Sequence, residues 1–200
     1  MESLDVLGKR AKAASRQMAK FKITKKNEVL EMVADELIKK ADEIKKANKA
    51  DVDEAVKNGM KPALIDRLTL TDARIEGMAE GLRQLVALED PVGEITSMKQ
   101  RPNGLMIGYK KVPLGVIAII YESRPNVTVD AFGLTFKSGN AVILRGGSDS
   151  INSNIKLVEI IRDTLNRAGV CEDAVILISD TDRKYCLLYT SPSPRDVEES

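Results

Sequence analysis

The sequence predicts an α/β protein in which a long helical region precedes a parallel sheet of β-α-β-α-β order. Two apolar runs rich in Ile and Val, Leu114 to Tyr121 and Ala141 to Leu144, flank a segment of helical length. A third apolar run, Ala174 to Ile178, follows a second amphipathic segment. Strands that alternate with helices in this way are typical of a parallel sheet with right-handed crossover connections.

Helical periodicity dominates the first hundred residues. Apolar stripes with a spacing of three or four residues occupy 4–18, 29–44 and 75–86, which predicts amphipathic helices there. Thr24 precedes the second stripe and is expected to cap that helix, and Thr71 precedes the third stripe.

The strands and helix ends carry further expectations. Leu114 to Tyr121 is nearly all apolar, which predicts a strand covered on both faces and excludes an exposed edge. Before it, 90–104 is predicted to be a loop, and Leu105 to Lys111 a short alternating strand that leads into the buried one. Gly139 and Gly169 are expected to end the two helices that follow.

The connection Arg145-Gly146-Gly147-Ser148 leaves the second buried strand at the carboxyl end of the sheet, where open α/β sheets bind ligands. Its two glycines suit either a tight turn or the close approach of a cofactor to the backbone at the start of a helix. Neither the G-x-G-x-x-G spacing nor the G-x-x-x-x-G-K-[ST] loop occurs in the chain. Spacing alone therefore gives only a weak prediction of a nucleotide site.

Composition excludes several kinds of site. The 31 basic and 30 acidic residues leave a net charge of +1, so no general field attracts nucleic acid or an acidic membrane. The chain has no histidine, and Cys171 and Cys186 have no metal-binding spacing, which excludes zinc sites and Ser-His or Cys-His catalysis. No apolar run is long enough for a membrane span and the amino terminus has no signal core, so we expect a cytoplasmic protein. Solvated, ion-paired helix faces are expected at the lysine pairs 25–26, 39–40 and 45–46.

Three stretches resemble one family closely, and they are LIDRLTLTDARIEGMAEGLRQ (64–84), YESRPNVTVD (121–130) and KSGNAVILRGG (137–147). They are similar to the gamma-glutamyl phosphate reductase family, a branch of the aldehyde dehydrogenase superfamily. The superfamily binds its nucleotide through a P-x-G-V strand and a K-P-x-E loop, in whose places this chain has Pro113 to Val116 and Arg145 to Ser148. The resemblance extends over about residues 4–184 and implies an aldehyde-dehydrogenase-like, Rossmann-type parallel sheet.

The resemblance implies an NADP-dependent oxidoreductase. The family reduces L-glutamyl 5-phosphate with NADPH to L-glutamate 5-semialdehyde and phosphate in proline biosynthesis, through a thioester on an active-site cysteine. That cysteine belongs to a later domain, so we expect no catalytic residue in this chain and a structural role for Cys171. The alternatives are another NAD(P)-dependent aldehyde or acyl-phosphate dehydrogenase of the superfamily, or a non-catalytic nucleotide-binding or scaffold fragment.

We expect cofactor contacts from Arg145, Gly146, Gly147, Ser148 and, in the P-x-G-V strand, Pro113. Arg145 replaces the superfamily's lysine where the adenosine ribose should lie, and a guanidinium there suits a ribose phosphate. Ser148 stands where relatives that prefer NAD carry an acid, so both residues favour NADP. The alternative for Arg145 is a surface salt bridge at a strand end.

Arg124 and Asn126 follow the first buried strand and are the expected substrate-binding residues. Arg124 could attract the phosphate or carboxylate of the substrate. Asn126 cannot be equated with the asparagine near the thioester oxygen in aldehyde dehydrogenases, because the segment between Gly115 and Asn140 is shorter here. Its alternative role is to cap the following helix.

We divide the chain into a helical part of the cofactor domain at 1–104, the first β-α-β-α-β part of the NADP-binding domain at 105–185, and a tail at 186–200. The tail has prolines between serines, no apolar periodicity and a resemblance to translated sequencing-adapter DNA, so it is expected to be non-native. On this interpretation the catalytic domain is missing and the chain alone is inactive. The full-length protein is expected to be a homo-oligomer that binds a small-molecule substrate and neither nucleic acid nor membrane.

Overall fold

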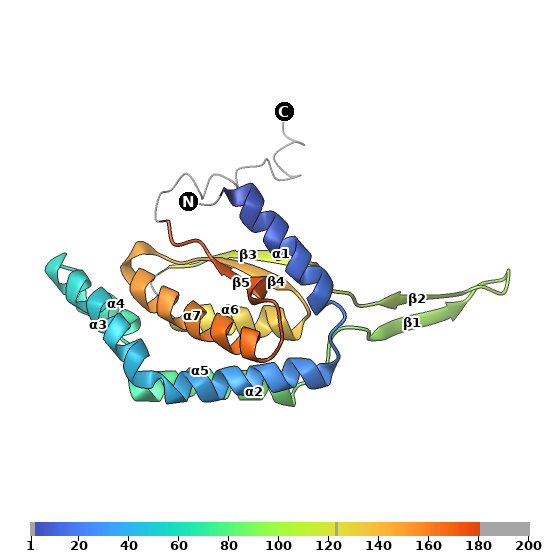
Figure 1. The fold of residues 1–200 in the computed structure, drawn as a ribbon. Helices are drawn as coiled ribbons and strands as arrows, with labels where there is room; N and C mark the ends of the chain where they lie inside the picture. Colours follow the sequence, from blue (N-terminus) through green and yellow to red (C-terminus); the bar gives the residue numbers. More distant parts are fainter. Residues whose placement is uncertain (1–2, 123, 181–200) are drawn as a thin grey trace.

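A three-stranded parallel sheet stands at the centre of the fold, as the computed structural model shows (Figure 1). Its strands β3 (Val116–Ile120), β4 (Ala141–Arg145) and β5 (Val175–Leu177) lie side by side in chain order. The predicted parallel β-α-β-α-β order is therefore confirmed. The structure describes residues 3–122 and 124–180, and the predicted tail at 186–200, with Cys186, lies outside them.

Two helices connect the strands on one face of the sheet, and a third helix covers the other face (Figure 1). The connecting helices are α6 (Asn126–Lys137) and α7 (Ile151–Arg167), and the chain leaves them at Gly139 and Gly169 as expected. Both glycines have positive φ, 75° and 69°, a conformation that side chains disfavour.

The helix on the opposite face is α1 (Leu4–Met18), which contacts β4 and the 3-10 turn at Glu172–Ala174. An ion pair fastens it there, with Arg10 Nη2 and Asp173 Oδ1 2.5 Å apart. Arg10 is also the main reason why the pKa of the Asp173 carboxyl is lowered.

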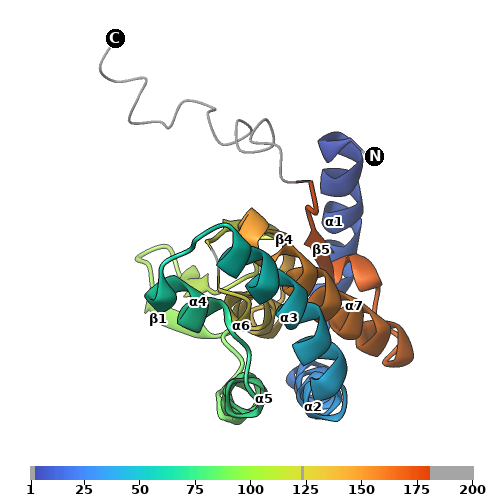
Figure 2. The same ribbon diagram turned by 90° about the vertical axis from the view of Figure 1, so that its left-hand side faces the viewer.

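The remaining helices form a further layer beyond α6 and α7. In Figure 2, α2 (Ile23–Lys39) and α5 (Asp72–Ala87) lie side by side below α6 and α7, while α3 (Ala41–Lys57) and the short α4 (Pro62–Leu68) lie nearer the viewer. The facing surfaces of these layers are apolar and fully buried, as Leu37, Leu82, Phe132 and Phe136 illustrate. Among the described residues, none of the helices combines the length and apolar character needed to cross a bilayer.

The apolar stripe at 29–44 is divided between two helices, which differs from the single helix that the periodicity predicts. The chain leaves helical geometry at Lys40 (φ −101°, ψ 21°), so α2 ends there and α3 can turn to pack against α7. Thr24 does not cap α2, whose first residue is Ile23 and whose N-cap is Lys22. Thr71 does cap α5, because its side chain accepts a hydrogen bond from the Arg74 amide.

The predicted loop at 90–104 is wrong, because it contains a strand. β1 (Ile95–Gln100) pairs antiparallel with β2 (Met106–Lys110), and the resulting hairpin projects from the body of the molecule (Figure 1). Gly104 provides the positive φ, 86°, in its turn. β2 confirms the strand predicted at Leu105 to Lys111. All residues of β1 are exposed, so no burial pattern marks it in the sequence.

β3 is an edge strand among the described residues, contrary to the expectation that 114–121 is covered on both faces. The sheet order places β4 in the middle, so β3 pairs with β4 alone. Helix α1 lies mainly over β4, which leaves Ile120 44% exposed and Leu114 83% exposed. The apolar run therefore predicted a strand correctly, but it predicted a strand covered on both faces where the structure has an edge strand.

One of the lysine pairs does not lie on a solvated face. Lys25 pairs with Glu28 at the surface as expected, but the Lys26 side chain is 1% exposed and its Nζ lies 2.8 Å from Asp90 Oδ1. Lys137, also buried, donates from Nζ to Asn27 Oδ1 at 2.7 Å. Burial lowers the pKa of Lys137, and the nearby charge of Lys26 acts in the same direction.

A buried carboxylate joins the helical region to the sheet. Asp51 of α3 is 4% exposed and accepts hydrogen bonds from the backbone amides of Asn152 (3.1 Å) and Ser153 (2.8 Å) in the first turn of α7. The side chains of the same two residues donate to it as well, at 2.8 Å and 2.5 Å. A negative group is favourable at a helix N-terminus, so Asp51 satisfies the helix and fixes α3 against it.

We expect Asp51→Ala to lower the free energy of unfolding by about 3 kcal/mol, because four donors lose a charged, buried acceptor. Urea denaturation followed by circular dichroism measures this. The matched control is Asp53→Ala on the same helix, whose exposed pair with Lys49 contributes about 0.3 kcal/mol. Equal losses in the two variants would contradict the assigned role of Asp51.

Candidate functional site

A cavity of about 570 Å³ opens at the carboxyl ends of β3 and β4, and we call it the strand-end cavity. One wall comes from the segments that follow the two strands, and the other from α4 and Met60 before it. Parallel strands end together at this edge, which brings side chains about 20 residues apart in the sequence onto one surface. The lining residues are Met60, Leu64, Arg67, Ile120, Tyr121, Glu122, Arg124, Arg145, Gly147, Ser148 and Asp149.

The structure brings four of the seven predicted site residues together in this cavity: Arg124, Arg145, Gly147 and Ser148. Pro113 lies at the opposite end of β3, before its first residue, where its ring packs against Gly139. A strand of five residues separates these ends by about 16 Å, so Pro113 is not part of this site.

Gly146 is required by packing inside the protein. A Cβ added there would stand 2.2 Å from Nδ2 of Asn154 and 3.3 Å from the Tyr121 ring. The backbone at Gly146 and the buried side-chain amide of Asn154 therefore fit together only because Gly146 has no side chain. Of the two interpretations of the glycine pair, close internal packing explains Gly146, whereas Gly147 faces the cavity.

A chain of hydrogen bonds, each with a defined donor, supports the loop that follows β4. Thr128 Oγ1 donates its single proton to Asn154 Oδ1 (2.9 Å), so in the 2.6 Å contact between Tyr121 and Thr128 the phenol is the donor. Asn154 Nδ2 then donates to Ser150 Oγ (3.0 Å), and Ser150 Oγ to the Gly147 carbonyl (3.4 Å). Thr128, Ser150 and Asn154 are fully buried, so this chain holds the Gly147 backbone in one position.

The first turn of α7 offers no free binding place at Asn152 and Ser153. Their amides are bonded to Asp51, as described above. The arrangement expected at a glycine-rich loop, with a phosphate held by helix amides, is thus filled at these two positions by a protein carboxylate. Side chains can also bind an anion in the strand-end cavity, because three guanidinium groups line it: Arg67, Arg124 and Arg145.

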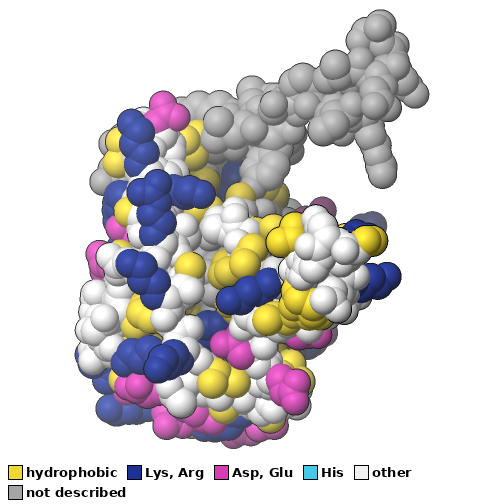
Figure 3. Space-filling view, turned by 90° about the vertical axis from the view of Figure 1, so that its right-hand side faces the viewer, with side chains coloured by type: hydrophobic (Ala, Val, Ile, Leu, Met, Phe, Trp, Pro, Cys, Tyr) yellow, Lys and Arg dark blue, Asp and Glu magenta, His cyan; other side chains and the backbone are white. Residues whose placement is uncertain are grey.

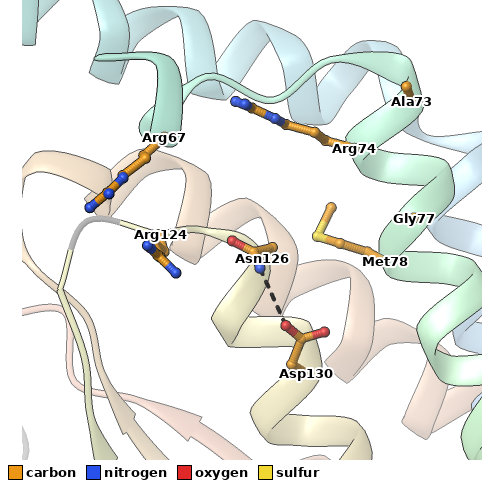
Figure 4. Close-up of a pocket in the computed structure, with 8 residues that line it drawn as sticks. All are labelled: Arg67, Ala73, Arg74, Gly77, Met78, Arg124, Asn126 and Asp130. Atoms are coloured by element: carbon orange, nitrogen blue, oxygen red, sulfur yellow. Dashed lines mark hydrogen bonds between the residues drawn. The ribbon is translucent and has the colours of Figure 1, made fainter. Parts of the chain in front are cut away.

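A second cavity of about 470 Å³ adjoins the first, and we call it the α5 cavity (Figure 4). Asn126 begins α6 but does not cap it, because the N-cap is Pro125 and Asn126 donates instead from Nδ2 to Asp130 Oδ2 at 3.3 Å. Burial raises the pKa of Asp130, and this hydrogen bond offsets the effect only in part. The α5 cavity is lined by Arg67, Ala73, Arg74, Gly77, Met78, Arg124, Asn126 and Asp130.

Sequence reasoning missed Arg67 and Arg74. Both lie in the stretch 64–84 that carries the family resemblance, so that resemblance was the available signal. Helical periodicity could not single them out, because an arginine on a polar helix face is ordinary. Their importance depends on the packing of α4 and α5 beside the loop that carries Arg124.

Cys171 lies far from both cavities. It comes before β5, at the amino end of the sheet, and packs against the hydrophobic core. This position agrees with the expected structural role.

We expect Tyr121 to remain protonated up to a pH of about 12, because burial raises its pKa from 10.0 to about 12. A pKa raised on folding gives stability that is complete below pH 10 and is lost as the pH rises toward 12. Tyrosinate absorbance and urea denaturation at alkaline pH measure the two effects. Tyr121→Phe should remove the titration step at the highest pH and flatten the stability profile between pH 10 and 12. The control Tyr109→Phe, at an exposed tyrosine, should change neither the step nor the profile. A Tyr121 that titrates near pH 10 would contradict its place in a buried hydrogen-bond chain.

Comparison with known proteins agrees with this geometry. The model of the aldehyde dehydrogenase family matches residues 2–188. A gamma-glutamyl phosphate reductase of Lachnospira eligens is 63% identical over 183 residues, which are 92% of this chain and 44% of that protein. One of Halothermothrix orenii is 55% identical over 176 residues, 88% of this chain and 42% of that protein.

Solved structures give the same result. The gamma-glutamyl phosphate reductase of Thermotoga maritima is 40% identical with a TM-score of 0.90, over 94% of this chain and 45% of that one. That of Saccharomyces cerevisiae is 32% identical with a TM-score of 0.86, over 92% and 48%. The chain spans less than half the length of these relatives. With a family match over nearly all of its described residues, the chain belongs to the aldehyde dehydrogenase family.

Proposed function

We propose that this chain is the cofactor-binding part of a reductase that converts L-glutamyl 5-phosphate to L-glutamate 5-semialdehyde and phosphate with NADPH, a step of proline biosynthesis. The observation that carries the proposal is the convergence of Arg124, Arg145, Gly147 and Ser148 in one cavity at the carboxyl ends of the strands. The names of the relatives supply the reaction, which applies to a whole protein that contains this chain.

The residues of the strand-end cavity fit a phosphorylated nucleotide. Arg145 would pair with the ribose 2′-phosphate, and Gly147 leaves room beside the backbone. Asp149 lines the same cavity and favours ribose hydroxyls over a phosphate, so the preference for NADP rests on Arg145 more than on the absence of an acid at Ser148. When bound, the nicotinamide group supplies the hydride.

The chain's own residues bind and orient in this reaction. In the proposed chemistry a thiolate attacks the acyl carbon and phosphate leaves with the electrons of the C–O bond. The carbonyl carbon of the resulting thioester would then accept hydride, and the C–S bond would break to release the aldehyde and regenerate the thiolate. No cysteine of the described residues lines either cavity, so the thiol has to come from outside them. In this proposal Arg124 attracts an anionic group of the substrate, and the Tyr121 to Gly147 hydrogen-bond chain keeps the cofactor side rigid.

A second copy of the protein is the partner that the exposed hairpin favours. Apolar side chains gather on this projecting arm, interspersed with lysine and arginine (Figure 3). We propose a cytoplasmic homo-oligomer in which the hairpin contacts another subunit, since exposed apolar surface of this extent marks an association site. The exposed apolar residues of β1, β2 and their turn are Ile95, Met98, Leu105, Met106, Ile107 and Tyr109.

A chimera tests the proposed reaction. We expect residues 1–180 of this chain, joined to the remaining sequence of the Lachnospira eligens relative, to reduce NADP⁺ with glutamate 5-semialdehyde only when phosphate is present. Arg145→Gln should raise the KM for NADP⁺ about tenfold and leave that for NAD⁺ little changed, because one charged pair to the 2′-phosphate is lost. Arg16→Gln, at an exposed arginine of α1 that lines neither cavity, is the control. Phosphate-independent activity, or none, would disprove the proposed substrate.

The same chimera tests the interface. We expect the double variant Ile107→Glu, Tyr109→Glu to dissociate the oligomer, because two charges on one side of β2 would be buried without partners. Size-exclusion chromatography with light scattering measures the mass. Leu88→Glu, at an equally exposed apolar residue after α5, should leave the mass unchanged. A chimera that is already monomeric would exclude the hairpin interface.

A further inference from the structure

Arg67 and Arg124 are the two residues that line both the strand-end cavity and the α5 cavity. They come from different parts of the chain, Arg67 from α4 and Arg124 from the connection between β3 and α6. Figure 4 shows both side chains in the space between α4 and this connection. The junction of the two cavities is therefore bordered by two guanidinium groups.

Neither guanidinium has a hydrogen bond or an ion pair with any residue in the described part of the chain. The third arginine of the α5 cavity is different, because Arg74 is bonded to the carbonyls of Asp66 and Thr69 and pairs with Asp66 Oδ2 at 3.0 Å. Arg74 thus fixes the turn between α4 and α5, and with it the place of Arg67. Arg74 therefore has a positioning role, whereas Arg67 and Arg124 remain available to bind a ligand.

The acids nearby do not neutralise this pair. Asp130 accepts from Asn126, and the raised pKa of its carboxyl has burial as its main cause, with no arginine among the groups that act on it. Glu122 and Asp149 line the strand-end cavity, and neither forms a hydrogen bond or ion pair with the guanidinium group of Arg67 or Arg124. Two cations at one junction repel each other, and an anion with several oxygens relieves that repulsion while it accepts from both.

We propose that Arg67 and Arg124 form a subsite for the phosphoryl group of the substrate, an acyl phosphate, and hold the phosphate as it leaves. The proposal rests on the proposed function and deepens it. The cofactor's phosphates are the other possible source of this chemistry. We assign the substrate because the α5 cavity, which extends from the junction away from Arg145 and Ser148, contains no residue of the loop after β4.

The test measures binding of acetyl phosphate to the 200-residue chain by calorimetry, with acetate as the ligand that lacks the phosphoryl group. We expect acetyl phosphate and not acetate to bind, and Arg67→Gln and Arg124→Gln each to weaken binding about tenfold. The double variant should lose less than the product of the two single effects if the arginines share one anion. Arg16→Gln, at an exposed arginine of α1 that lines neither cavity, removes the same charge elsewhere and should leave the affinity unchanged.

Saturating NADP⁺ separates the two sources of phosphate. If the substrate's phosphoryl group occupies the subsite, acetyl phosphate still binds in the presence of NADP⁺, and Arg67→Gln leaves the affinity for NADP⁺ unchanged. Displacement by NADP⁺, equal binding of acetate, or arginine variants that bind normally would each overturn the subsite. Because NADP⁺ affinity and its loss in Arg145→Gln are measured separately, the cofactor proposal can fail while the subsite stands, and the reverse.

Discussion

The contact between Asp51 and the first turn of α7 is the constraint on which the site depends. It joins a helix from the first third of the chain to the helix that follows the glycine pair, and so brings α4 and Arg67 to the carboxyl end of the sheet. It also satisfies two amides that could have held a phosphate. The same carboxylate therefore positions one wall of the cavity and removes two amides from the donors that an anion could use, while three arginine side chains line the cavity.

The sequence predicted best the elements whose apolar residues are buried. The order of β3, α6, β4, α7 and β5 followed from apolar runs and from glycines that end helices, because burial and backbone geometry both act locally there. In the hairpin, β2 was predicted from its alternation, whereas β1 was missed because its residues are all exposed and show no burial pattern. Whether a strand is central or at an edge depends on sheet order, which periodicity does not contain, and the turn at Lys40 depends on how α3 packs against α7.

The sequence predicted the site residues that lie at strand ends, but it did not predict the residue that tertiary packing brings beside them. Arg124, Arg145 and Ser148 follow strand ends, and parallel strands end together, so their proximity could be expected. Arg67 lies 57 positions before Arg124, and only the packing of α4 relates the two. Gly146 shows the opposite case, since a glycine that the sequence analysis assigned to cofactor binding is explained by its packing against a buried asparagine 8 positions later.

The ion pair between Arg10 and Asp173 has a consequence for synthesis on the ribosome. Its partners are 163 positions apart, so α1 emerges among the first residues of the chain and meets its place on the sheet only near the last described ones. At typical translation rates that interval is on the order of ten seconds. Until β4 has been synthesised, the apolar face of α1, with Ala11, Ala14 and Met18, has no sheet to cover, and the nascent chain is open to chaperones during this time.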